Sequence, residues 1–136
     1  MRKLVSFLSL CLLSAIMMGC QNELLAQQEK DVDSPVLLYR MVSFGEIEED
    51  SFFTVSDEYT IQLFKEAISS AKKVSGMADV VDPQFQVEFG EKVYYLWIDQ
   101  DRSSVMDSED SNTLYMIKDN NADQIYDFLS ATDLID

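Results

Sequence analysis

The sequence predicts an α+β domain in which a mostly antiparallel sheet of about five strands carries two helices packed together on one face. Three observations indicate this class. Several short apolar segments show the two-residue alternation that is typical of strands. Two longer segments repeat their apolar residues at spacings of three and four, as amphipathic helices do. The patterns follow the order strand or strands, helix, two hairpins and a final helix, without internal repeats.

The single domain is predicted to occupy residues 36–136. Its first segment, 36–44 (VLLYRMVSF), is apolar and rich in β-forming residues, which predicts a strand. Residues 46–51 (EIEEDS) predict an acidic loop. Residues 52–55 (FFTV) predict a second short strand or a continuation of the first.

The first helix is predicted to follow at once. Ser56 can cap its N-terminus, and the acidic residues 57–58 then lie in the first turn, where the helix dipole favours negative charge. The lysines at 72–73 would lie in the last turn, and Gly76 would take the left-handed position beyond it. The predicted apolar stripe consists of Tyr59, Leu63, Phe64, Ala67, Ile68, Ala71 and Val74.

The first hairpin is predicted after the Asp-Pro turn at 82–83. Residues 84–89 alternate between polar and apolar side chains, as in a strand with one buried face. Gly90 supplies the positive φ that a tight hairpin turn needs. The returning segment 93–98 (VYYLWI) is apolar on both faces, which favours a central position in the sheet.

A second hairpin and a helix complete the domain. Residues 104–107 and 113–117 predict two strands joined by a polar loop. Asn121 is predicted to cap the last helix, with Gln124 at the third helical position of an arrangement that resembles a capping box. The inward stripe of this helix is predicted to contain Ile125, Phe128 and Leu129.

Several short motifs occur in the order found in a known family. They are Lys73-Val74-Ser75-Gly76, then Pro83 with Phe85-Gln86-Val87, then Tyr95-Leu96-Trp97-Ile98, Met106-Asp107 and Thr113-Leu114-Tyr115. On these motifs, the stretch 67–129 resembles the YhfM-like domain of small, uncharacterised lipoproteins from Bacillus-type bacteria. The resemblance implies this fold and a lipoprotein. Because that family has no assigned reaction, the resemblance implies no catalytic residues.

The first twenty residues have the layout of a bacterial lipoprotein export signal. Arg2 and Lys3 form a basic start, residues 4–18 an uncharged apolar run, and Gly19-Cys20 a processing point. The Gly-Cys pair resembles a lipobox, in which Cys20 becomes the lipid-modified first residue. Residues 1–19 are therefore interpreted as the signal peptide, and 20–35 as the lipidated Cys with a flexible polar tether.

Two alternatives for the N-terminus are open. An uncleaved membrane anchor fits less well, because the apolar run of 15 residues is shorter than the ~20 that a bilayer crossing needs. An ordinary secretory signal also fits less well, because the bulky Met17 and Met18 stand where small residues are usual. The lipoprotein interpretation predicts a protein anchored on the extracytoplasmic face of the cell membrane.

Composition excludes several functions. The chain has no His, which excludes His-based catalytic triads and zinc sites of the usual Cys/His type. Its 10 basic and 25 acidic residues become 8 and 25 without residues 1–19, a net charge of −17. Such a charge argues against nucleic-acid binding and favours cations or basic proteins as partners. It is also explained simply by the solubility of an exported protein.

One acidic segment has the oxygen spacing of a calcium loop. The ligands would be Asp99, Asp101, Ser103, Asp107 and Asp110. A Ser replaces the usual Gly at the sixth position, an Asp replaces the usual Glu at the twelfth, and the flanks resemble strands. These departures weaken the calcium interpretation and favour a solvated turn, a strand and a second polar loop. The acidic residues at 46–50 are likewise interpreted as a solvated loop.

The predicted central strand places Tyr95 and Trp97 on one face. If both helices cover the other face, the two rings form an exposed aromatic binding surface. If another segment covers them, they belong to the core. Strands that are apolar on both faces are more commonly buried on both. Taken together, the sequence predicts a lipid-anchored, non-catalytic binding or accessory module without cofactors, whose partner is an unidentified protein or cell-envelope component. The alternatives are a calcium-responsive module and, third, a small cell-envelope enzyme.

Overall fold

The computed structural model describes residues 34–76 and 79–135, which belong to one compact unit, Ser34–Asp136. The predicted signal peptide, Cys20 and nearly all of the predicted tether lie outside the described residues. Among the helices of the described residues, none is long and apolar enough to cross a membrane.

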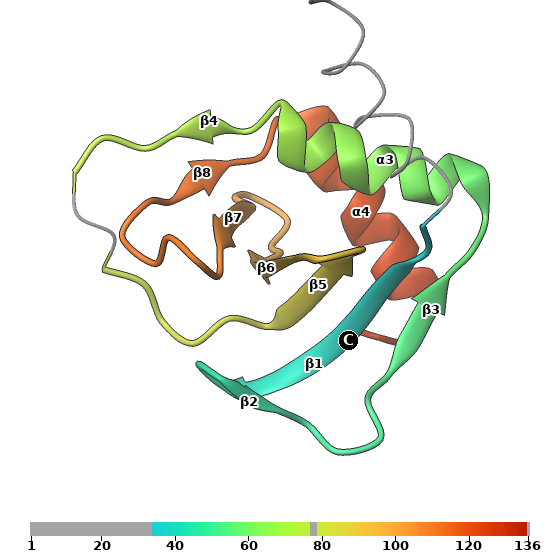
Figure 1. Cartoon of the computed structure of the whole chain (residues 1–136). Coiled ribbons are helices and arrows are strands. Elements are labelled where there is room, and N and C mark those ends of the chain that lie inside the picture. Colours follow the sequence, from blue (N-terminus) through green and yellow to red (C-terminus); the bar gives the residue numbers. More distant parts are fainter. Residues whose placement is uncertain (1–33, 77–78, 136) are drawn as a thin grey trace, which may run out of the picture. The chain divides into compact units, whose positions relative to one another are not determined.

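Within these residues, eight strands form one antiparallel sheet (Figure 1). They are β1 (Val36–Ser43), β2 (Glu46–Ile47), β3 (Phe53–Val55), β4 (Lys72–Lys73), β5 (Phe85–Phe89), β6 (Lys92–Trp97), β7 (Ser104–Asp107) and β8 (Tyr115–Met116). Their order is β2-β1-β5-β6-β7-β8-β4, and β3 also pairs with β1. The α+β class is confirmed, but the predicted number of strands was too low. The two-residue strands β2 and β4 depend on pairing with distant residues, which local patterns do not report.

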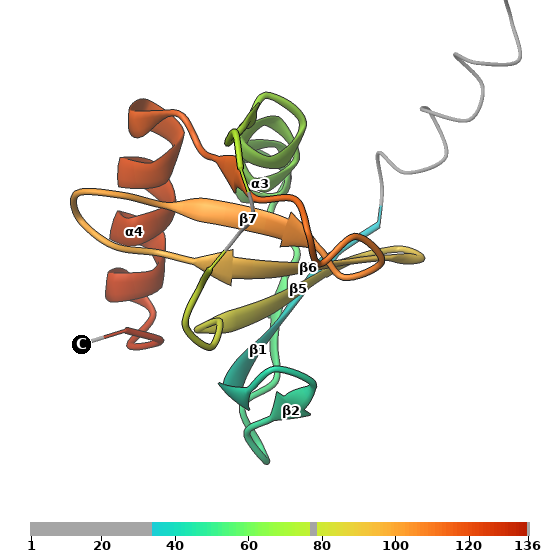
Figure 2. The ribbon, with the colours of Figure 1, turned by 90° about the vertical axis from the view of Figure 1, so that its left-hand side faces the viewer.

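The two predicted hairpins are confirmed, and they form the centre of the sheet (Figure 2). Gly90, with a φ of 55°, turns the chain between β5 and β6, so that Phe89 pairs with Lys92. In the second hairpin, Ser104 of β7 pairs with Met116 of β8. The acidic segment 46–51, which was predicted to be a loop, contributes β2 instead.

The first helix, α3, spans Glu58–Ser69 and is shorter than predicted. Asp57 caps it in place of Ser56, because the Asp57 Oδ1 accepts a hydrogen bond of 2.9 Å from the Thr60 N–H. The lysines 72–73 do not lie in its last turn; they form β4 and pair with β8. Tyr59 is not part of the apolar stripe, since it is 70% exposed. Gly76 has a positive φ but lies well beyond the helix end.

The last helix, α4, spans Asp119–Ala131 and starts before the predicted cap. Lys118 occupies the cap position without a side-chain hydrogen bond, and Asn121 lies buried inside the first turn. Gln124 is not part of a capping box; its Nε2 donates to the Asn120 carbonyl. The predicted inward stripe is confirmed for Ile125 and Leu129, which are fully buried, and Phe128 packs against the core.

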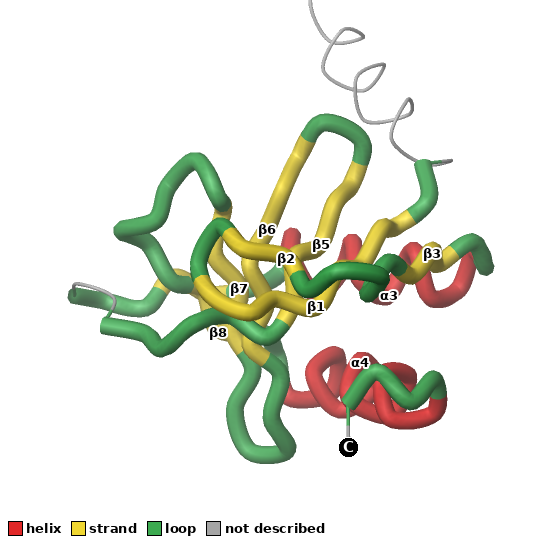
Figure 3. Tube along the Cα trace, turned by 90° about the horizontal axis from the view of Figure 1, so that it is seen from below, coloured by secondary structure: helices red, strands yellow, loops and turns green. Residues whose placement is uncertain are grey.

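The main core lies between the two helices and one face of the sheet (Figures 1 and 3). Phe128 of α4 joins the layers, because its ring lies 6.1 Å from the rings of both Phe53 in β3 and Phe64 in α3. The fully buried strand residues on this face include Val36, Leu38, Phe85, Val87 and Leu96. The prediction of two helices packed on one face is therefore confirmed.

Candidate functional site

The strand register assigns side chains to two faces of the sheet. Leu38 pairs with Val87, and Val87 with Tyr94, on the face that the helices cover. The next positions, Tyr39, Gln86 and Tyr95, pair across the same three strands. Because successive side chains of a strand point to opposite faces, this second row belongs to the other face of the sheet, here called the opposite face.

Tyr95 and Trp97 lie half-buried on the opposite face, outside the main core. Phe44 packs against both rings, with centroid distances of 5.4 Å to Tyr95 and 6.0 Å to Trp97. The Trp97 Nε1 donates a hydrogen bond of 3.0 Å to the carbonyl of Val81. The two rings are therefore partly covered by neighbouring segments, yet their surroundings differ from the fully buried core that the strand pattern favoured.

Phe44 is the residue of this site that the sequence interpretation missed. It was assigned to the first strand, whereas β1 ends at Ser43 and Phe44 begins the turn to β2. Gly45, with a φ of 78°, allows this turn, and the Phe44 N–H donates to the Asp82 carboxylate at 3.1 Å. The hydrogen bond fixes the turn beside the segment that precedes β5. The Phe-Gly pair at the strand end is the local signal that could have indicated it.

A second aromatic pair extends the site along β1. The rings of Tyr39 and Phe52 lie 5.3 Å apart, and Phe52 is 56% exposed. Burial, and next the nearby Glu88 carboxylate, raise the pKa of Tyr39 above its ordinary value. We define the aromatic surface as Tyr39, Phe44, Phe52, Tyr95 and Trp97.

Carboxylates accompany this aromatic surface. Glu88 lies on the opposite face, where its carboxylate accepts a hydrogen bond of 2.7 Å from the Gln86 amide. Asp82 holds the Phe44 turn, and Glu46 accepts a hydrogen bond from Ser43 next to it. The surface therefore combines apolar rings with negative charge. Such a combination suits positively charged side chains, which interact both with carboxylates and with aromatic rings.

The predicted calcium ligands are not brought together. Asp99, Asp101 and Ser103 lie in the loop before β7, whereas Asp107 and Asp110 lie at its far end, so that the strand separates the two groups. The Ser103 hydroxyl accepts from the Asp99 N–H at 3.3 Å, and the Asp107 carboxylate accepts from the Glu109 N–H. Across residues 34–76 and 79–135, no group of three or more acidic or Cys side chains is placed to hold a metal ion.

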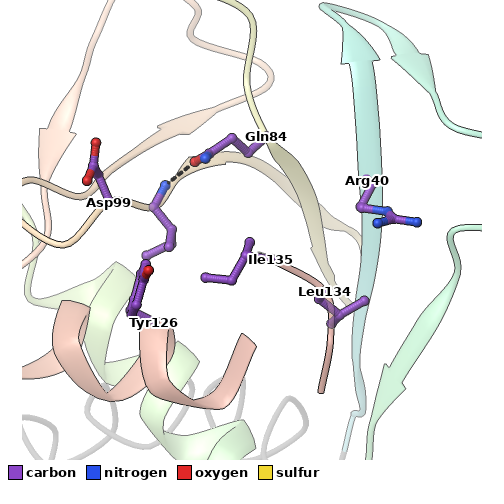
Figure 4. Close-up of a pocket in the computed structure, with 7 residues that line it drawn as sticks. Arg40, Gln84, Asp99, Tyr126, Leu134 and Ile135 are labelled. Atoms are coloured by element: carbon purple, nitrogen blue, oxygen red, sulfur yellow. Dashed lines mark hydrogen bonds between the residues drawn. The ribbon is translucent and has the colours of Figure 1, made fainter. Parts of the chain in front are cut away.

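A pocket of about 360 Å³ lies near the C-terminal end of α4, on the helix side of the sheet (Figure 4). Its polar groups already have partners in the chain. Arg40 pairs with Glu48 at 2.9 Å, and the Tyr126 hydroxyl accepts from Gln100. The Gln84 side chain accepts from the Ile98 N–H at 2.6 Å. Binding there would have to replace these contacts, so the aromatic surface is the stronger candidate. The lining residues are Arg40, Gln84, Ile98, Asp99, Tyr126, Leu134 and Ile135.

Comparison with known protein families identifies the family of this chain. The family model described as YhfM protein matches residues 44–134, which is more than half of the chain. The matched region includes most of the aromatic surface and both helices. No curated protein and no solved structure matches the chain.

Proposed function

This chain belongs to the YhfM family, and we propose that it is a lipid-anchored extracytoplasmic binding module that acts without catalysis. Its partner is a protein with a positively charged surface, which docks on the aromatic surface of the sheet. The proposal combines an anchor inferred from the sequence with a docking surface inferred from the fold.

The anchor is supported by the N-terminal sequence. Cys20 follows a basic start and an apolar run of 15 residues, and it is the only Cys beyond the proposed signal peptide. The polar segment 21–35 would then separate the lipid from β1, which begins at Val36. A tether of this composition lets a folded domain reach a partner above the membrane.

The exposure of the aromatic surface is the observation that carries the binding function. Phe44 is 43% exposed and Phe52 is 56% exposed, and both lie against half-buried rings of the same face. Large apolar side chains gathered at one surface mark interaction sites more often than isolated ones do. Aromatic residues are also the residues that most often dominate binding energy at protein interfaces.

The charge of the chain supports a basic partner. The net charge is −15, and Glu88, Asp82 and Glu46 lie at or beside the aromatic surface. Opposite charges accelerate association and discourage partners of the wrong sign. The same charge opposes docking on anionic lipid headgroups, which favours a protein partner over the bilayer itself.

The anchor is tested by changing Cys20→Ser in the full chain and fractionating the cells. We expect the wild-type protein in the membrane fraction and the Cys20→Ser protein in the soluble extracytoplasmic fraction, without incorporation of a labelled fatty acid. Membrane retention of the Cys20→Ser protein would contradict the lipid anchor.

The docking surface is tested by photo-crosslinking in intact membranes. We expect a basic protein to be captured by the wild type, and the capture to fall with Phe44→Ser and with Phe52→Ser. The matched control is Tyr59→Ser, because Tyr59 is also an exposed aromatic residue but lies on α3. The proposed surface would be overturned if all three variants captured the partner as the wild type does. It would also be overturned if added salt did not weaken the capture.

A further inference from the structure

A second cavity, of about 260 Å³, opens beyond the C-terminal end of α3, on the helix side of the sheet. It is separate from the aromatic surface, which lies on the opposite face. Its walls combine three apolar side chains, two phenol rings, one carboxylate and the end of a helix. The lining residues are Ile68, Ser69, Ala71, Tyr94, Val105, Asp107 and Tyr115.

We propose that this cavity binds a small organic cation of the quaternary ammonium type. The inference goes beyond the docking function, because no residue of the aromatic surface lines the cavity. Three features of its wall favour positive charge, and each comes from a different part of the chain.

The sheet places the two rings on the strands that flank β7, which carries the carboxylate. Tyr94 of β6 pairs directly with Asp107 of β7, and Tyr115 of β8 pairs with Val105, two residues before Asp107. Residues two apart on a strand share a face, so these side chains belong to the helix side of three adjacent strands. A cation near aromatic rings is attracted by their negative faces, and quaternary ammonium groups are ligands that aromatic side chains bind in this way.

The end of α3 supplies the third favourable feature. Ile68 and Ser69, the last two residues of the helix, both line the cavity. The C-terminal end of a helix carries partial negative charge, which favours a cation. The last turn of α3 contains no basic residue that would neutralise this end.

The remaining chemistry favours a quaternary over a primary ammonium. A primary ammonium has three N–H donors that need acceptors, and the walls at Ile68, Ala71 and Val105 supply no side-chain acceptor. The Asp107 Oδ1 already accepts from the Glu109 N–H at 2.8 Å. The volume lies below the roughly 300–1,000 Å³ of pockets for drug-sized ligands, which suits a small cation.

Lys92 is a charged competitor beside Asp107. Lys73 of β4, which pairs with Tyr115, is a second cation near the cavity wall. The Lys92 Nζ lies 3.4 Å from a Glu109 carboxylate oxygen and 3.9 Å from the Asp107 Oδ2. The hydrogen bond to Glu109 and the charge of Glu109 raise the pKa of Lys92, with Asp107 contributing less. Lys92 is therefore charged at neutral pH, and its loss should strengthen binding of a cation beside Asp107.

The test is a titration of the full chain, in a maltoside detergent, with choline chloride against sodium chloride at equal ionic strength. Amide NMR shifts at Ala71 and Val105 report the cavity. We expect saturable shifts with choline, about five- to tenfold weaker binding in Tyr115→Leu, and retained binding in Tyr115→Phe, which keeps the ring. Asp107→Asn should also weaken binding, whereas the control Asp110→Asn should not.

Saturable binding that survives both Tyr115→Leu and Asp107→Asn would overturn the site, as would the absence of saturable shifts in the wild type. If Tyr115→Leu fails to fold, Asp107→Asn and Lys92→Met decide the matter, since they must weaken and strengthen binding respectively. Phosphocholine should bind less tightly than choline because the Asp107 carboxylate repels its phosphate. The reverse order would contradict an acidic site. None of these results depends on the membrane anchor or the docking partner.

Discussion

On the helix-covered face, the side chains of Val36 and Leu38 are completely buried, whereas Leu37 and Tyr39, which alternate with them along β1, are only half-buried on the opposite face. Two helices close the first face, and their packing joins residues from most of the chain. The rings of the opposite face are covered only in part, by the Phe44 turn and by Val81. We therefore propose that the first face stabilises the fold and that the opposite face is the one available for binding.

The largest predicted effect compares neighbours of β6 that belong to different faces. Leu96→Ala should lower the free energy of unfolding by about 2–5 kcal/mol, because it creates a cavity in the main core. Tyr95→Ala should cost less, about 1–2 kcal/mol, because Tyr95 is half-buried and can be replaced partly by water. Urea unfolding followed by circular dichroism measures both values.

Fluorescence provides a second probe of the same comparison, because Trp97 is the only Trp and lies on the opposite face. Coincident transitions by the two methods would indicate that both faces unfold together. A Tyr95→Ala protein as unstable as Leu96→Ala would mean that the opposite face is a second core. The docking surface would then lose its basis.

The unequal faces were only partly predictable from the sequence. The alternation in residues 85–89 and the turn at Gly90 are local signals, and both agree with the fold. The residues that share a face with Tyr95 also follow from alternation. The position of Phe44 over these rings does not follow from alternation. It depends on a turn that is held by the side chain of Asp82, far along the chain.

The same reasoning explains the error at the end of α3. Lys72 and Lys73 are good helix-forming residues, and their charge suits a helix C-terminus. In the fold they pair with Met116 and Tyr115, which no local pattern reports. The predicted calcium ligands lie apart for a related reason, because residues 104–107 form a strand between the two acidic groups.

A smaller effect concerns the helix layer alone. Asp57→Ala should lower the free energy of unfolding by about 1 kcal/mol, because it removes the hydrogen bond to the Thr60 N–H without changing either face of the sheet. Ser56→Ala is the matched control, since the adjacent Ser56 was the predicted cap, and it should have little effect. Thermal unfolding measures both. A larger loss with Ser56→Ala would reassign the cap and shift the start of α3.

The smallest effect is a pH dependence that comes from the opposite face. Burial, followed by the charge of Glu88, raises the pKa of Tyr39 above its ordinary value of 10.0. Above that pH, the folded protein keeps the phenol proton that the unfolded chain loses, so the unfolded state binds fewer protons. Stability must then fall as the pH rises through this range. Below it, Tyr39 contributes no pH dependence.

Urea unfolding of the wild type and of Tyr39→Phe at several pH values isolates this contribution. The unfolding free energy of the wild type minus that of Tyr39→Phe should be constant below pH 10.0. It should then decrease as the pH rises, because only the wild type loses stability through Tyr39. Glu88→Gln should reduce the change without abolishing it, because burial is the larger cause. A difference that stays constant at all pH values would mean that Tyr39 is as solvated in the folded protein as in the unfolded chain. The opposite face would then be more open around Phe52 than its ring contact with Tyr39 indicates, and the contrast between the two faces would be sharper still.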